Sequence, residues 1–140
     1  MTHTIEQKNA LKLIGWKQHM TCYSQIDAME QKWLAHAPGG DKDLYYIELP
    51  ASHVGASEGF VYAIGWLSGG DKATGDYEII AVPGGRYAVF DVPEEDLDDV
   101  GHFKGTIHDF LTKSGNWCAG VEIQLVKPGN NMEVAFLLGE

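Results

Sequence analysis

The sequence contains few cysteines and no long apolar run. Its two cysteines, Cys22 and Cys118, lie far apart, and no Cys-x-x-Cys pair occurs among the 140 residues. Two isolated cysteines predict free thiols in a reducing compartment rather than a disulfide framework. No stretch has the length and apolar character of a membrane-spanning helix, and residues 1–8 are too polar for a signal peptide. We therefore expect a cytoplasmic protein that makes no contact with a membrane.

Positive charge is also scarce. Lysine and arginine together number 10 against 20 acidic residues, which gives a formal net charge of −10, and Arg86 is the single arginine. Nucleic-acid binding requires a basic face that displaces counterions, so we expect no direct contact with nucleic acid. An acidic protein is compatible with a cationic ligand, although acidity often serves solubility alone.

Recognisable catalytic and metal-binding patterns are missing as well. The six histidines are scattered, and no His-Glu-x-x-His pattern occurs. Residues 55–59 have the spacing of a serine nucleophile elbow, but they lead into a predicted strand instead of a helix. We expect no metal ion, no cofactor and no catalytic residue. The sequence does not decide whether the protein is an enzyme, and we favour a protein without enzymatic activity.

The clearest pattern in the chain is an order of strand, helix, strand, strand in its second half. Residues 86–92 are rich in β-branched and aromatic side chains, which predicts a strand that ends at Pro93. Apolar residues at spacings of three and four predict an amphipathic helix over 97–113, with an acidic start and a stop at Gly115. Two further strands are predicted at 121–126 and 132–138.

The same order of elements is predicted in the first half. It consists of a strand at 11–17, a helix from Ser24 to the Pro-Gly-Gly sequence at 38–40, and strands at 44–49 and 60–66. A loop at 69–75 and a short strand at 77–82 separate the halves. We therefore predict a single domain, 1–140, with repeat one at about 10–67 and repeat two at about 85–138.

The alternation in 121–126 predicts which residues share a face of the sheet. Val121, Ile123 and Leu125 are expected to lie under the second helix. Glu122 and Gln124 are then expected on the opposite face, where a functional site should be sought.

Several short motifs resemble one family. Residues 62–65, Tyr-Ala-Ile-Gly, followed by 82–90, Val-Pro-Gly-Gly-Arg-Tyr-Ala-Val-Phe, resemble the bacterial GyrI-like small-molecule-binding family. That family includes the effector-binding domains of AraC-type and multidrug-sensing transcription activators. Residues 110–115 resemble its helix end, and Glu122 lies where the family places a glutamate. Thr112-Lys113 replaces the proline usual before Ser114, and Gln124 replaces an aromatic residue.

The resemblance implies an α+β fold in which an antiparallel sheet has two helices on one face and a ligand groove on the other. It also implies a groove with aromatic walls and an acidic residue, which binds a hydrophobic and cationic or amphipathic small molecule. A carboxylate in apolar surroundings and aromatic faces both favour a cation. The residues that we expect to contact the ligand are Glu122, Tyr46, Tyr62, Trp66, Tyr87, Trp117 and Phe136.

Three functions are compatible with this resemblance. The first is a stand-alone module for ligand sensing, sequestration or transcriptional control, with or without an unknown protein partner. The second is a GyrI-like hydrolase in which Glu122 acts as general base. The third is an inhibitor of gyrase type that binds a protein. We favour the first, because one carboxylate alone supplies only part of a hydrolytic mechanism.

Overall fold

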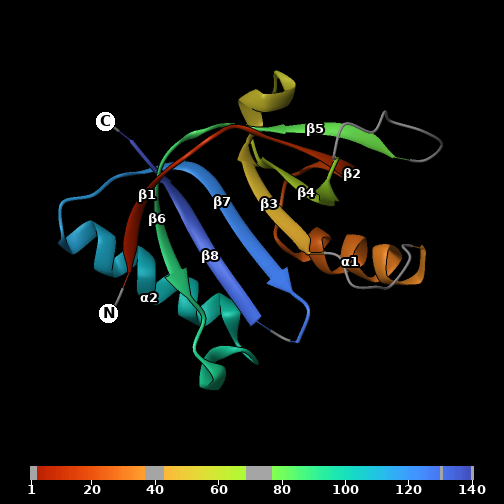
Figure 1. Ribbon diagram of the computed structural model, residues 1–140. Helices are drawn as coiled ribbons and strands as arrows, with labels where there is room; N and C mark the ends of the chain where they lie inside the picture. Colours follow the sequence, from red (N-terminus) through yellow and green to blue (C-terminus); the bar gives the residue numbers. More distant parts are fainter. Residues whose placement is uncertain (1–2, 37–42, 69–76, 130, 140) are drawn as a thin grey trace.

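The computed structural model describes residues 3–36, 43–68, 77–129 and 131–139 (Figure 1). Two α-helices and the strands of one sheet make up these residues. In chain order the elements are β1 Thr4–Lys8, β2 Leu11–Met20, α1 Ser24–His36, β3 Leu44–Pro50, β4 Phe60–Leu67, β5 Glu78–Val82, β6 Gly85–Asp91, α2 Val100–Lys113, β7 Cys118–Lys127 and β8 Asn131–Leu138. Short 3-10 turns follow β3 at Ala51–Val54 and β6 at Glu94–Asp96.

The strands form one eight-stranded sheet in the order β1-β6-β8-β7-β3-β4-β2-β5. Every neighbouring pair is antiparallel. The order is symmetric about its middle, because β7, β8 and β6 follow one another on one side as β3, β4 and β2 do on the other. The predicted α+β class with an antiparallel sheet and two helices is confirmed.

Both helices pack on the same face of the sheet (Figure 1). In the strand register, Ala88 is opposite Phe136, Phe136 opposite Glu122, Glu122 opposite Glu48, and Glu48 opposite Tyr62. Directly paired residues point to one face. Ala88 and Phe136 pack in the cluster under α2, and Tyr62 packs in the cluster under α1. The prediction that both helices cover one face is therefore correct.

The helices pack through short apolar stripes, as the spacing predicts. Their buried residues are Met29 and Trp33 on α1, and Phe103, Ile107 and Leu111 on α2. Leu34 is apolar but lies beside the buried stripe of α1 and is 72% exposed. It follows Trp33 directly, and successive residues of a helix point about 100° apart.

Helix α2 begins three residues later than the spacing predicts. Its first residue is Val100 rather than Leu97, because Glu94–Asp96 forms a separate 3-10 turn. Asp99 caps the helix, since its side chain accepts a hydrogen bond from the backbone N–H of His102 at 3.1 Å. The predicted end of the first helix at 38–40 and the predicted loop at 69–75 lie outside the described residues.

One strand was not predicted. β1 pairs with β6 at the edge of the sheet, where Thr4 is opposite Val89. The first strand is expected near Leu11, because the residues of β1 are polar. Most of them are exposed in the structure, so they lack the apolar alternation that marks a strand with one buried face.

The links between strands force the sheet to curl. β5 and β6 stand six places apart in the strand order, which in a flat sheet corresponds to about 29 Å. Only Pro83 and Gly84 join them, and such a link spans at most about 11 Å. Asn9 and Ala10 likewise join β1 to β2. The two links run side by side (Figure 1), and a Cβ at Gly84 would lie only 2.6 Å from the backbone nitrogen of Ala10.

The curl encloses the face of the sheet that the helices leave bare. Leu13 and Ile80 near one edge and Tyr87 near the other belong to the same apolar cluster as Ile47 and Ile123 in the centre. This inner face is therefore a core that is closed by the sheet itself.

The inner face corrects the predicted orientation of β7. Val121 and Ile123 belong to the inner cluster, and Leu125 packs against it, so none of the three lies under α2. Glu122 and Gln124 instead point to the helix side. The prediction was wrong because it assigned the apolar residues of β7 to the helices, whereas the curled sheet supplies its own apolar cover.

Candidate functional site

The two helices leave a band of the sheet uncovered between them. We call the helix-side residues of β3 and β7 the central strip: Leu44, Tyr46, Glu48, Glu122, Gln124 and Val126. All six are partly exposed. On the same face of the flanking strands, Tyr62 and Ile64 are buried on β4, and Val134 and Phe136 are buried on β8. The difference follows from the packing of α1 on β4 and α2 on β8.

Two carboxylates meet in the middle of the central strip. Glu48 and Glu122 are register partners across β3 and β7, and we call them the acid pair. The Lys104 ammonium on α2 donates to Glu122 Oε2 at 2.9 Å, and the exposed fractions of these two side chains are 20% and 16%. His108, one turn further along α2, places its Nε2 at 3.9 Å from Glu122 Oε1.

Glu48 has a different partner. The Tyr23 hydroxyl donates a hydrogen bond to Glu48 Oε1 at 3.1 Å. Burial raises the pKa of Glu48 above the ordinary value, and the neighbouring charge of Glu122 raises it further. The hydrogen bond from Tyr23 and the charges of Lys104 and His108 lower this pKa, but the net direction is upward. The two carboxylates therefore have unequal surroundings.

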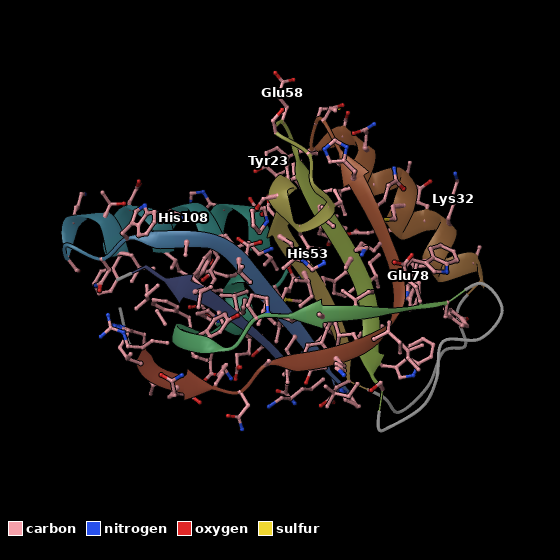
Figure 2. All side chains as sticks on the ribbon, turned by 90° about the horizontal axis from the view of Figure 1, so that it is seen from above. Tyr23, Lys32, His53, Glu58, Glu78 and His108 are labelled. Carbon is pink, nitrogen blue, oxygen red and sulfur yellow. The ribbon has the colours of Figure 1, made fainter. Side chains whose placement is uncertain are left out.

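Aromatic rings stand at both ends of the acid pair. Tyr23, which is 68% exposed, stacks on Phe60 with 4.7 Å between ring centroids and 25° between planes. On the other side, the ring of His108 meets Phe136 edge to face at 4.7 Å. Figure 2 shows Tyr23 and His108 on different elements, with β7 passing between α2 and the first half of the chain. Ring faces beside carboxylates are surroundings that attract cations.

Three of the predicted ligand residues belong to the packing of α1. Tyr62 is buried and donates to Glu30 Oε1 on α1 at 2.9 Å, and burial together with Glu30 raises the pKa of this tyrosine. Tyr46 and Trp66 pack against the same cluster, and burial, with a smaller contribution from Glu30, raises the pKa of Tyr46. Phe136, a fourth predicted residue, is buried under α2 next to Glu122.

Two predicted residues lie away from the acid pair. Tyr87 is on the inner face, where its hydroxyl donates to the carbonyl oxygen of Pro83 at 2.6 Å and burial raises its pKa to about 12. Trp117 precedes β7 and is 66% exposed. The structure thus brings Glu122, Phe136, Tyr46 and Tyr62 together on the helix side. The ligand-binding role of all seven residues stays a prediction.

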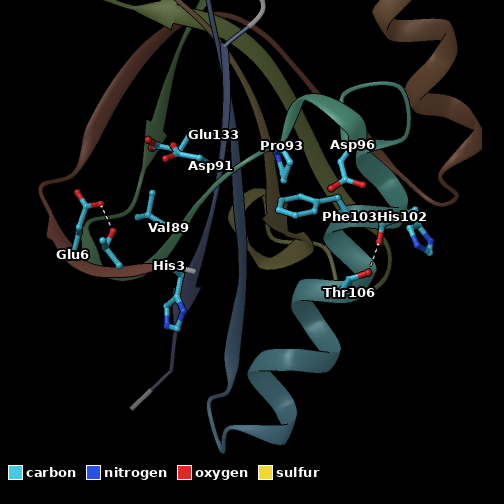
Figure 3. A pocket seen from close by; sticks show the side chains of 11 residues that line it. His3, Glu6, Val89, Asp91, Pro93, Asp96, His102, Phe103, Thr106 and Glu133 are labelled. Atoms are coloured by element: carbon cyan, nitrogen blue, oxygen red, sulfur yellow. Dashed lines mark hydrogen bonds between the residues drawn. The ribbon is translucent and has the colours of Figure 1, made fainter. Parts of the chain in front are cut away.

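Cavities of the described residues lie on other parts of the molecule. One, of about 390 Å³, opens on the inner face and is lined by Tyr45, Tyr87 and Ile123 among others. Another, of about 850 Å³, surrounds the end of β1, and Figure 3 shows Asp91 and Glu133 pointing into the same space. Neither cavity is lined by the acid pair. In the part of the chain that the structure describes, no three His, Cys, Asp or Glu residues are grouped to hold a metal ion.

Sequence reasoning missed four residues of the site: Tyr23, Glu48, Lys104 and His108. A signal for Glu48 was present, because it lies on the strand that follows α1 as Glu122 lies on the strand that follows α2. Lys104 and His108 each follow a buried residue of α2, so they flank its apolar stripe four residues apart. No comparable signal marks Tyr23, whose position depends on how α1 begins.

The fold and the acid pair define a small α+β domain with a partly buried, negatively charged surface between two helices. The chain belongs to the family described as GyrI-like small molecule binding domain, whose model matches residues 1–124. The resemblance inferred from the motifs is thereby confirmed. Among curated proteins no sequence match was found.

Solved structures share this fold at low sequence identity. A candidate bacterial transcription regulation protein from Staphylococcus aureus is 14% identical with a TM-score of 0.79, covering 100% of this chain and 99% of the other. SAV2435 bound to tetraphenylphosphonium is 17% identical with a TM-score of 0.79, at coverages of 99% and 94%. An integron cassette protein of Vibrio cholerae is 12% identical with a TM-score of 0.66, at 98% and 95%. At these identities the likeness concerns the fold alone.

Neither α1 nor α2, nor any other helix within residues 3–36, 43–68, 77–129 and 131–139, has the length and apolar character needed to cross a membrane.

Proposed function

We propose that this GyrI-like domain binds a hydrophobic cation across the central strip, with the acid pair supplying the negative charge. The observation that carries the proposal is the pairing of Glu48 and Glu122 in register on a partly buried surface. The proposed site lies on the helix side, not on the face expected from the sequence.

The electrostatics of the acid pair favour a positively charged ligand. Two carboxylates on adjacent strands repel each other, and burial adds a desolvation cost to each charge. The raised pKa of Glu48 is the expression of that cost. A bound cation reduces both the repulsion between the carboxylates and the cost of their desolvation. The ring faces of Tyr23 and Phe60 each add about 0.5–2 kcal/mol to the free energy of binding a cation.

Two comparisons support this ligand class. The family is described as binding small molecules, and a solved structure of the same fold, SAV2435, is bound to the lipophilic cation tetraphenylphosphonium. The biological setting is part of the proposal: a cytoplasmic module that senses or sequesters its ligand, or that acts as the effector module of a transcription regulator such as the AraC type. Contact with a further protein stays a prediction.

A pair of ions with one shape and opposite charge tests the proposal. Tetraphenylphosphonium and tetraphenylborate are closely similar in size, and their affinities can be measured by isothermal titration calorimetry. We expect the cation to bind at least about tenfold more tightly than the anion. We also expect the double variant Glu48→Gln, Glu122→Gln to lose this preference. Equal affinities of the wild-type protein for the two ions would contradict the proposal.

Hydrolysis is a second candidate function, which one observation favours. A carboxyl group whose pKa is raised by burial, beside a second carboxylate, is an arrangement that can act as a proton donor or acceptor. The test is mass spectrometry of electrophilic ligands incubated with the wild-type protein, Glu48→Gln and Glu122→Gln. We expect the ligands to be recovered intact. A hydrolysed product that appears with the wild-type protein and is absent with either variant would establish the enzyme instead.

A further inference from the structure

We propose that Glu48, rather than Glu122, is the counter-ion of the bound cation. Glu122 is instead paired with the ammonium group of Lys104 from the protein itself. The site then accepts one positive charge from its ligand. This inference rests on the proposed function, since it concerns which carboxylate of the same acid pair binds the ligand.

Glu122 is already neutralised by the protein. The ammonium of Lys104 lies 2.9 Å from its Oε2, and each of the two side chains is at least four-fifths buried. An ion pair with so little solvent around it is screened weakly. A ligand that took the place of Lys104 would leave the ammonium without a partner, and that loss opposes the exchange.

Glu48 has no such partner. Among the ion pairs of the described residues, none includes Glu48. Its hydrogen bond comes from the neutral hydroxyl of Tyr23, which reaches Oε1. Because the Tyr23 side chain is largely exposed, a ligand can approach the carboxylate beside this ring or replace it. Glu48 therefore carries the negative charge that is open to a ligand.

The balance of charges sets the valence of the ligand. Two carboxylates and one ammonium leave one net negative charge in the centre of the strip. His108 lies farther from Glu122, at 3.9 Å, and half of its side chain is exposed. The geometry thus fits a monovalent lipophilic cation whose charge lies over β3, with its apolar part against Tyr23 and Phe60.

The decisive experiment removes the ion pair as a unit. Glu122→Gln alone would free Lys104 to repel the ligand, so it cannot tell the two carboxylates apart. The double variant Glu122→Gln, Lys104→Met leaves the net charge unchanged and removes no charge that we assign to the ligand. Glu48→Gln removes that charge. Calorimetric titration with tetraphenylphosphonium compares both with the wild-type protein.

We expect Glu48→Gln to weaken tetraphenylphosphonium binding about tenfold or more, and the double variant to stay within about threefold of the wild-type protein. Glu48→Asp, which keeps the charge, should retain most of the affinity. Matched controls are Glu133→Gln on the inner face of β8 and Lys113→Met at the exposed end of α2. Both should leave the affinity unchanged.

A divalent cation tests independently whether Lys104 limits the site to one positive charge from the ligand. Lys104→Met exposes a second carboxylate, so the affinity for an alkane-linked bis(triphenylphosphonium) should rise about tenfold, and by more than the affinity for tetraphenylphosphonium. The opposite pattern, in which the double variant loses tetraphenylphosphonium and Glu48→Gln retains it, would overturn this inference while leaving the proposed function in place. A wild-type protein without charge preference would overturn both.

Discussion

The two faces of the sheet are built from the same strands but differ in what covers them. Ile47 points inward and is fully buried, whereas its neighbour Glu48 points to the helix side and is partly exposed. On the inner face the curled strands cover one another, because β1 and β5 are linked by two residues to strands near the opposite edge. On the helix side α1 and α2 cover the outer strands and leave β3 and β7 open.

This difference shows that cover by helices is a poor guide to burial in a curled sheet. On β3, and on β7 up to Val126, the face without helices carries only apolar and aromatic side chains, whereas the face with helices holds the acid pair. The alternation of a strand therefore separates two tasks. One set of side chains stabilises the fold, and the other set presents charge to solvent and ligands.

The largest expected effect tests the inner face as a core. Ile47→Ala should lower the free energy of unfolding by about 2–5 kcal/mol, because it removes a fully buried side chain from the middle of the inner cluster. Urea denaturation measures the change. The matched variant Gln124→Ala, on the helix side of the adjacent strand, should cost less than about 0.5 kcal/mol. Equal costs would remove the distinction between the faces.

Two tyrosine–carboxylate hydrogen bonds allow a buried and an exposed part of the helix side to be compared. Tyr62→Phe should lower the free energy of unfolding by about 1–3 kcal/mol, because the hydroxyl is buried and its partner Glu30 is a carboxylate. Tyr23→Phe removes the exposed bond to Glu48 and should cost less than about 1 kcal/mol. A larger cost for Tyr23→Phe in urea denaturation would show that the central strip is more enclosed than its exposed fractions indicate.

The pH dependence of stability measures how strongly burial and charge repulsion disfavour the ionised acid pair. The pKa of Glu48 is raised in the folded protein, so the folded state binds this proton more tightly than the unfolded chain does. Between the two pKa values, the free energy of unfolding therefore falls as pH rises. Glu48→Gln should remove this fall and be more stable than the wild-type protein at neutral pH. The difference should vanish below about pH 4.

Denaturation at a series of pH values checks this prediction, with Glu133→Gln as the control on the inner face of β8. A variant that is less stable than the wild-type protein at neutral pH, and equally so at all pH values, would contradict the raised pKa of Glu48.

The smallest expected effect concerns a residue far from the acid pair. Trp117→Ala should leave the affinity for tetraphenylphosphonium within about twofold of the wild-type value, because Trp117 is exposed and precedes β7. Calorimetric titration measures it. A larger loss would restore Trp117 to the binding site and move the site beyond the central strip.

The elements with one buried face could be predicted from the sequence. The strands at 44–49 and 121–126 and the stripe of Phe103, Ile107 and Leu111 carry the period of their structure in their apolar residues. β1 could not be recognised in this way, because an exposed edge strand needs no apolar side chains. Its existence depends on pairing with β6, some 80 residues later in the chain.

The site was only partly predictable. Glu122 was identified by its family position, but its face was wrong, because alternation fixes which residues share a face and not which face lies under a helix. Glu48 and Lys104 acquire their roles from pairing across β3 and β7 and from the seating of α2. Those contacts join residues more than 15 positions apart, and no local pattern records them.

The pairing of the edge strands β1 and β5 also affects how the chain folds during its synthesis. β1 belongs to the first half of the chain but pairs with residues 85–89, and β5 pairs back with β2. At about 5–20 residues per second, a ribosome takes roughly 4–16 seconds to supply the partner of β1 after β1 itself. During that time the outer edge of β2 is also unpaired, and neither half contains a complete sheet. The two halves must therefore be completed together, and a nascent chain that stopped after β4 would expose two open strand edges to aggregation.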